Sequence, residues 1–230
     1  MSYKLFASHH IKGLIDQGEH QQLDFKFCIS DSRKIARSLV AFSNTDGGKL
    51  LIGVKDNGSI AGVRSDEEYY MVEGAAELYS KPPVKFEVQE WNIEGKTVLE
   101  VTVSKSEKKP HYAQEENGKW MVYIRVDDQN LLANNVLLKV WRRQKSKKGV
   151  YVRYTNIEKL LFEYLKQSNT ITFGRFCKIA GITRSRAENI LVNMILLDII
   201  DIEFTENGTY YRIKENQKTS EKDSNKRNKR

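Results

Sequence analysis

The stretch SNTDGGKLLIGVKDNG, Ser43–Gly58, decides the fold of the N-terminal part of the chain. Gly47 and Gly48 follow a helical apolar pattern, and glycine readily takes the left-handed backbone conformation that ends helices. The next residues, KLLIGV, are almost continuously apolar, which predicts a strand buried on both faces. Asp56-Asn57-Gly58 is a turn signal before SIAGV at 59–63, so we expect a second strand and a hairpin.

The same stretch does not fit an ATPase-type phosphate-binding loop. That loop needs G-x-x-x-x-G-K-[ST] between a strand and a following helix. Here Lys49 is followed by Leu50, and the stretch leads from a helix into a strand. We therefore interpret the glycines as structural turns.

Around this stretch the apolar patterns alternate between helix and strand periods. Asp31 or Ser32 caps a predicted helix, and a second helix is predicted over 66–79, before Pro82-Pro83. Strands are predicted at 84–91, 96–104 and 120–126, followed by a helix over about 130–142. The pattern predicts an α+β fold with a mixed, mostly antiparallel sheet and helices.

The C-terminal part predicts three helices and a hairpin. Apolar residues from Ile157 to Leu165 have helical spacing, a short helix follows over 173–180, and Thr183 caps a third. Glu206-Asn207-Gly208 lies between two β-rich runs, which is a strong hairpin signal. This order resembles a winged helix-turn-helix, in which the helix after the turn enters the DNA major groove. The resemblance implies nucleic-acid contacts from Arg184, Ser185, Arg186 and Asn189.

Positive charge is concentrated between the two parts. Residues 1–138 hold 17 basic and 20 acidic side chains, whereas Lys139–Arg153 holds seven basic and none acidic. We predict an N-terminal α+β domain over 1–143, a basic linker over 144–153, a winged helix over 154–214 and a disordered charged tail over 215–230. A basic linker suits a polyanion, and its candidate nucleic-acid contacts are Arg142, Arg143, Lys145, Lys147 and Lys148.

Three blocks of the N-terminal part carry a family pattern: GEHQQLDFK, IARSLVAFSNTDGGKLLIGVKDNGSIAGV and KPHYAQEENGKWMVYIRVDDQNLLA. Together they resemble the Schlafen AlbA-like domain, over most of Glu19–Ala133. The resemblance implies nucleic-acid binding, and bacterial members often carry a C-terminal winged helix. The family is also labelled ATP-binding, which is our weakest alternative because the phosphate-binding loop is missing.

Some animal relatives are metal-dependent endoribonucleases with three carboxylates. The resemblance places these at Glu19, Asp24 and Asp56, with Asp24 standing where glutamate is usual. Hard oxygen ligands favour Mg²⁺ or Mn²⁺, and such an ion activates water against a phosphodiester. Asp24 and Lys26 lie two residues apart, hence on one face of a strand, so Lys26 is a fourth candidate catalytic residue. The alternative is that these residues have no catalytic role: Asp56 would make local hydrogen bonds in its turn, and Asp24 and Lys26 would be an exposed pair on a strand.

Two functions thus stay open: a DNA-binding regulator, or a metal-dependent nuclease acting on structured RNA. Animal relatives join two AlbA-like lobes, so for this single lobe we expect a homodimer. The apolar runs are shorter than the roughly 18 residues of a membrane span, and the two cysteines lie far apart, so we expect a cytoplasmic protein without membrane contact.

Overall fold

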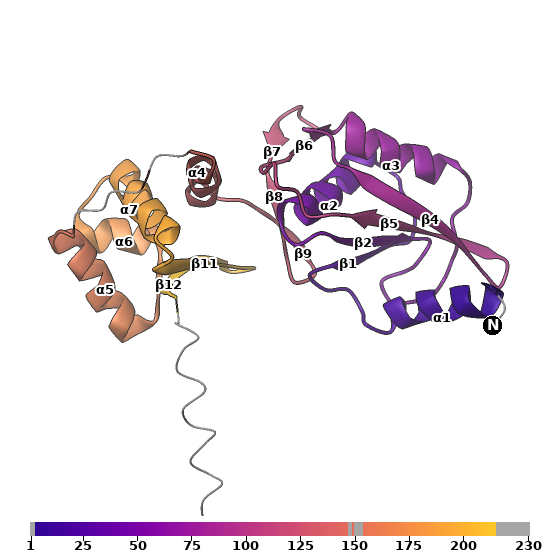
Figure 1. The fold of residues 1–230 in the computed structure, drawn as a ribbon, viewed down its shortest axis with the longest axis horizontal. Helices are drawn as coiled ribbons and strands as arrows, with labels where there is room; N and C mark the ends of the chain where they lie inside the picture. The colour runs from indigo at the N-terminus through magenta and orange to yellow at the C-terminus, as the bar shows by residue number, and fades with distance from the viewer. Residues whose placement is uncertain (1–2, 147–148, 150–153, 215–230) are drawn as a thin grey trace, which may run out of the picture. The chain divides into compact units, whose positions relative to one another are not determined.

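The computed structural model describes residues 3–146, 149 and 154–214. The chain divides into two compact units, Met1–Ala133 and Asn134–Arg230, and each is described by itself (Figure 1). The predicted tail over 215–230 lies outside the described residues, as do Lys147 and Lys148 of the predicted linker.

A four-stranded sheet forms the centre of the first unit, in the order β1-β2-β5-β4. β1 runs parallel to β2, and the other two pairings are antiparallel. The bounds are Leu23–Lys26 for β1, Gly48–Ile52 for β2, Phe86–Ile93 for β4 and Lys96–Val103 for β5.

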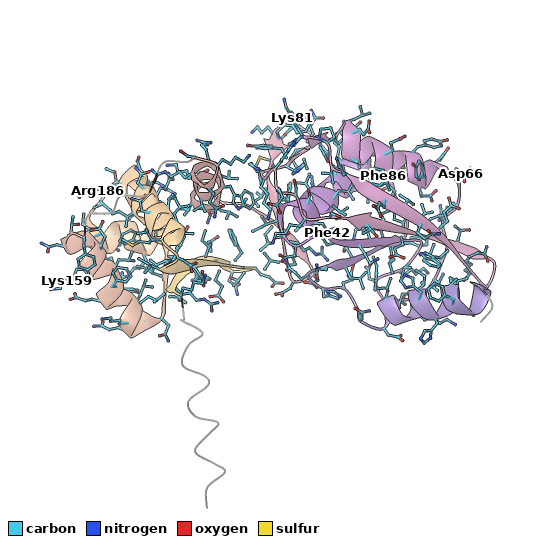
Figure 2. All side chains as sticks on the ribbon, viewed as in Figure 1. Phe42, Asp66, Lys81, Phe86, Lys159 and Arg186 are labelled. Atoms are coloured by element: carbon cyan, nitrogen blue, oxygen red, sulfur yellow. The ribbon has the colours of Figure 1, made fainter. Side chains whose placement is uncertain are left out.

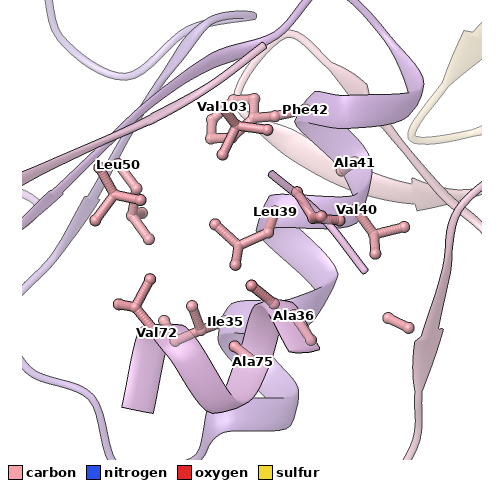
Figure 3. Packing of buried hydrophobic residues seen from close by; sticks show 14 of the residues in the cluster. Ile35, Ala36, Leu39, Val40, Ala41, Phe42, Leu50, Val72, Ala75 and Val103 are labelled. Carbon is pink, nitrogen blue, oxygen red and sulfur yellow. The ribbon is translucent and has the colours of Figure 1, made fainter. Parts of the chain in front are cut away.

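Helices cover both faces of this sheet. Figure 1 shows α2 (Ser32–Asn44) and α3 (Glu67–Glu77) on one face and α1 (Tyr3–Ile15) on the other. Side chains of β2 alternate between the two cores: Leu50 packs with the α2 and α3 residues of Figure 3, whereas Leu51 packs with α1. This alternation explains why the strand is apolar at nearly every position.

The helix-to-strand turn forms as the sequence predicts. The side chain of Asp31 caps α2 by accepting from the backbone N–H of Arg33. At the other end, the N–H of Gly47 donates to the carbonyl of Phe42, with Gly47 at φ +74°. A Cβ on Gly47 would lie 2.7 Å from the carbonyl oxygen of Val103, so the turn has no room for a side chain.

The predicted strand at 59–63 is wrong. β2 pairs with β1 and β5 instead, and the segment after the Asp56 turn makes a single β-bridge, Val54 with Ile60. The N–H groups of Ala61 and Gly62 both donate to the carbonyl of Gly53. This local turn, with both glycines at positive φ, bends the chain away from a ladder.

The predicted helix over 130–142 begins later. The chain first forms a hairpin of β8 (Tyr123–Val126) and β9 (Gln129–Leu132), and α4 then spans Asn135–Gln144. Three short strands make a further antiparallel sheet in the order β3-β6-β7. Their bounds are Ser80–Lys81 for β3, Tyr112–Gln114 for β6 and Trp120–Met121 for β7.

The described residues of the second unit form four helices and one antiparallel sheet in the order β10-β12-β11. Its elements after α4 are α5 (Asn156–Ser168), β10 (Thr170–Thr172), α6 (Phe173–Ala180), α7 (Arg184–Leu196), β11 (Ile200–Thr205) and β12 (Gly208–Ile213). Thr155 caps α5 in a capping box with Glu158, and Thr183 caps α7 as predicted.

The division between the units differs from the boundary expected after residue 143. α4 belongs to the second unit, because Val136 and Val140 are buried in the same core as Leu191 and Val192 of α7. The sequence of an amphipathic helix predicts that one of its faces is buried, but it does not show which neighbouring element covers that face.

The predicted α+β fold class is confirmed: seven helices accompany sheets that are mostly antiparallel within the described residues. Among the helices of the described ranges, none combines the length and the apolar character that crossing a membrane requires.

Candidate functional site

Asp24 lies at the centre of a buried charged cluster in the first unit. β1 directs this side chain toward α2, where it is only 3% exposed. Its carboxylate accepts hydrogen bonds from Lys26 Nζ at 3.0 Å, Ser38 Oγ at 3.2 Å and Arg125 Nη2 at 3.4 Å. Asp24 and Lys26 therefore do share a face of the strand, and they form an ion pair.

Glu19 joins the same cluster from the loop before β1. Its Oε1 accepts from the backbone N–H of Phe25 at 2.8 Å, and its carboxyl group shares a hydrogen bond with Asp24. Burial and the neighbouring Asp24 raise the pKa of Glu19. Burial alone would raise the pKa of Asp24 as well, but Lys26, the bond with Glu19 and Arg125 outweigh it and lower that pKa. The nearby Asp24 thus disfavours ionisation of Glu19, whereas Lys26 and Arg125 favour ionisation of Asp24.

Arg125 is the residue of this cluster that sequence reasoning missed. It comes from β8, is 2% exposed, and also donates to the carbonyls of His20 and Leu23. Its guanidinium lies 5.2 Å from the ring centre of Phe42. The available signal was a single arginine inside the apolar run of a strand, because a buried charge needs a partner.

The third predicted carboxylate, Asp56, does not join this cluster. It lies exposed in the turn after β2, and its side chain has no hydrogen bond or ion pair within the described residues. Over that same part of the chain, no three His, Cys, Asp or Glu side chains are arranged to hold a metal ion. The residues predicted to bind Mg²⁺ or Mn²⁺ do not fit that ion as they stand, since Lys26 and Arg125 already neutralise Asp24.

Glu19→Gln is expected to stabilise the first unit at pH 7 by a few tenths to about 1 kcal/mol. Glutamine can donate to Asp24 and accept from Phe25 N–H without adding a second negative charge. The pKa of Glu19 is raised in the folded protein. Its stabilising contribution to the free energy of unfolding is therefore present below the pKa of the unfolded chain and is lost as pH rises through the pKa of the folded protein. The gain in free energy of unfolding of Glu19→Gln over the native chain, measured by urea unfolding, should therefore grow from pH 4 to pH 7. A variant that is less stable than the native chain at pH 7 would contradict the prediction.

The predicted nucleic-acid contacts of the second unit gather around α7. Arg184, Ser185, Arg186 and Asn189 are all exposed on this helix. Arg184 makes a cation–π contact within its own unit, because its guanidinium lies 5.5 Å from the ring centre of Phe173.

α4 adds its own basic residues beside α7. Arg143 donates to Asn193 Oδ1 at 2.5 Å and to Asn189 Oδ1 at 3.4 Å. Lys139 forms an ion pair with Glu188, which neutralises an acidic side chain of α7. Arg142 and Lys145 are exposed near the end of α4, so residues predicted from two separate segments belong to one unit.

Comparisons with known proteins identify the first unit. A family model described as Schlafen, AlbA_2 matches residues 19–134, and a PCI domain model matches residues 149–204. A search of curated proteins gave no match.

Two solved structures illustrate more distant likeness. The DIP2311 protein from Corynebacterium diphtheriae is 16% identical with a TM-score of 0.43, over 67% of this chain and 36% of that one. The N-terminal domain of a RecG-related protein from Nitrosomonas europaea is 23% identical with a TM-score of 0.39, over 56% of this chain and 95% of that one. The identification depends instead on the family model, which spans half of the sequence: the chain belongs to the Schlafen AlbA_2 family.

Proposed function

We propose that this protein binds nucleic acid and acts as a DNA-binding regulator, with α7 and α4 of the second unit forming the duplex-binding surface. The observation that carries the proposal is the contact of Arg143 with Asn189 and Asn193. It joins the basic end of α4 to the exposed polar side of α7. Membership of the Schlafen AlbA_2 family supports nucleic-acid binding in general.

The order of elements supports a winged helix-turn-helix. α5, β10, α6 and α7 precede the hairpin of β11 and β12, and β10 pairs with β12. Gly181 ends α6 in the left-handed conformation, and Thr183 caps α7 two residues later. In that motif the helix after the turn lies in the major groove, with its N-terminal residues at the base edges.

The exposed side chains have the chemistry for this role. Arg142 and Arg186 can neutralise phosphates, which positions a protein on the duplex. Ser185 and Asn189 can hydrogen-bond to base edges, which carries sequence information. Because Lys139 pairs with Glu188, the acidic residue of α7 does not add an unpaired negative charge opposite the phosphates.

Arg186→Ala and Arg142→Ala are each expected to weaken duplex DNA binding about ten-fold or more, as the loss of a charged hydrogen bond would. Each should also reduce the slope of log affinity against log salt by about 1. Fluorescence anisotropy with a labelled 20-base-pair duplex, from low to moderate salt, measures both quantities.

Lys159→Ala provides the matched control. Lys159 is an exposed basic residue of α5 whose partner is Glu163, one turn along the same helix (Figure 2), and its loss should leave affinity and slope unchanged. If the arginine variants behave like this control, the α7 surface is not the duplex-binding site. If the native chain fails to bind duplex DNA even at low salt, the whole proposal fails.

Two predictions from the sequence stay predictions. A metal-dependent nuclease would need a third carboxylate beside Glu19 and Asp24, and incubation with transfer RNA and Mg²⁺ or Mn²⁺ tests it directly. The expected homodimer is tested by sedimentation at micromolar concentration.

A further inference from the structure

A group of exposed aromatic and basic side chains lies in the first unit, at one end of the parallel strand pair. Phe27 directly follows β1, and Lys55 follows β2 by three residues. Since β1 and β2 run parallel, their carboxyl ends meet at the same edge, where Gly53 N–H donates to the carbonyl of Lys26 at 2.8 Å. Lys55 Nζ lies 5.3 Å from the ring centre of Phe27.

Arg64 connects Phe27 to a neighbouring cleft. Its guanidinium carbon lies 5.6 Å from the ring centre of Phe27, and the residue also lines a cleft of about 480 Å³. Tyr69 and Tyr70 line the same cleft, with their rings nearly perpendicular at 5.7 Å. The cleft also includes Asp66, labelled in Figure 2 at the start of α3, and Glu90.

These rings are exposed although apolar packing would favour their burial. Phe27 is 38% exposed and Tyr70 is 66% exposed. Neither belongs to the buried residues that form the two cores of the first unit, within the part of the chain described. Two cationic side chains, Lys55 and Arg64, lie near the ring of Phe27, and both are themselves exposed.

This combination matches the chemistry of an unpaired nucleotide. Base stacking on an exposed aromatic ring contributes about 1–3 kcal/mol, and a guanidinium plane stacks on bases in the same way. Lys55 and Arg64 can neutralise the phosphates on either side of that base.

The acidic residues of the cleft decide which part of the nucleotide enters it. Asp66 and Glu90 would repel a phosphate, but a carboxylate accepts hydrogen bonds from exocyclic amino groups such as that of cytosine. A base is therefore the better occupant of the cleft, with its phosphates toward Lys55 and Arg64. A base inside a duplex has both faces stacked and cannot be bound in this way.

We propose that Phe27, Lys55, Arg64, Tyr69 and Tyr70, the Phe27 platform, bind an unpaired nucleotide of single-stranded nucleic acid. This inference rests on the proposed function for nucleic-acid binding in general. It concerns the first unit instead of the second, and single-stranded nucleic acid instead of a duplex. Single-stranded and duplex binding can therefore fail separately.

The test uses the full chain and a fluorescein-labelled 12-nucleotide oligocytidine, as RNA and as DNA, in anisotropy titrations at low salt. Phe27→Ala and Tyr70→Ala should each weaken binding about 5- to 150-fold, the range that corresponds to one lost stacking contact. Phe27→Trp keeps a stacking ring and should retain native affinity or exceed it. Duplex binding should be unchanged in all three variants.

Matched controls separate the platform from general charge and exposed aromaticity. Lys81→Ala removes an exposed lysine on β3 and Phe6→Ala removes a ring that is 53% exposed on α1, and neither should change oligocytidine binding. Lys55→Ala, in contrast, should weaken it. Because Tyr70 is the more exposed ring, its variant tests the platform even if Phe27→Ala perturbs folding, which circular dichroism would report.

Each outcome decides the question. If Phe27→Ala and Tyr70→Ala bind oligocytidine as tightly as the native chain, the platform is refuted. If the native chain binds the duplex but not the oligocytidine, the platform is refuted while the α7 surface stands. If Arg186→Ala loses duplex binding and keeps oligocytidine binding, the two sites are independent, as proposed.

Discussion

Asp24→Asn is expected to destabilise the first unit by about 3 kcal/mol at neutral pH, because removing one partner of a buried ion pair leaves the other charge uncompensated. Asp24 is 3% exposed and Arg125 is 2% exposed. The guanidinium would keep its backbone carbonyl acceptors at His20 and Leu23, which places the loss at the lower end of the range for such pairs. Equilibrium unfolding in urea measures it.

The effect of this substitution should depend on pH. The pKa of Asp24 is lowered in the folded protein, so its stabilising contribution is present above its unfolded pKa and is lost as pH falls through the folded one. The difference between native and Asp24→Asn should therefore shrink in acid. Asp56→Asn is the control, since Asp56 is exposed and should change stability by less than about 0.5 kcal/mol. Equal stability of the two variants at pH 7 would show that the ion pair is not important to the fold.

This prediction affects how any nuclease experiment on the protein is interpreted. A loss of cleavage in an Asp24 variant would follow from unfolding as readily as from a missing metal ligand. Asp56→Ala and Glu19→Gln avoid that ambiguity, because both positions are only partly buried or exposed. They are the substitutions that test a catalytic role for the carboxylates.

Val140→Asp is expected to unfold the second unit, or to destabilise it by several kcal/mol, while the first unit stays folded. Val140 is 3% exposed in the core that contains Leu191 and Val192, and a carboxylate placed there has no charged partner. Thermal unfolding should show the transition of the second unit at lower temperature. Duplex DNA binding should be lost with it, because α4 carries Arg142 and Arg143.

Asn135→Asp introduces the same side chain at an exposed position of α4. A carboxylate in the first turn of a helix is favourable, so this control should be as stable as the native chain. If Val140→Asp instead leaves the second unit intact, then α4 is not part of its core and the boundary belongs after residue 143, where the sequence placed it.

Local patterns predicted much of the fold. The helical face of α2, the buried strand β2 and the hairpin at Asn207-Gly208 all follow from spacing and turn chemistry that act over a few residues. Features that depend on partners distant in the chain were harder to predict from the sequence. The segment at 59–63 has the composition of a strand, but β2 already has partners on both sides.

The candidate site shows the same difference between features set by local sequence and features that depend on distant partners. The face shared by Asp24 and Lys26 follows from strand alternation and was predicted. The partner that neutralises Asp24 comes from β8, 101 positions away, and spacing within one segment does not reveal it. Asp56 belongs to a turn whose sequence also suits a purely local role, so its separation from Asp24 became visible only in three dimensions.

The contact between Asp24 and Arg125 also constrains the order in which the chain can mature. During synthesis at about 5–20 residues per second, Asp24 leaves the ribosome well before Arg125, which lies 101 positions later. The nascent first unit can assemble β1 and β2 early, but their buried carboxylate has no guanidinium until β8 has emerged. Lys26 is translated with Asp24, so the last stretch of this unit to emerge supplies the second of the two cations that pair with the carboxylate.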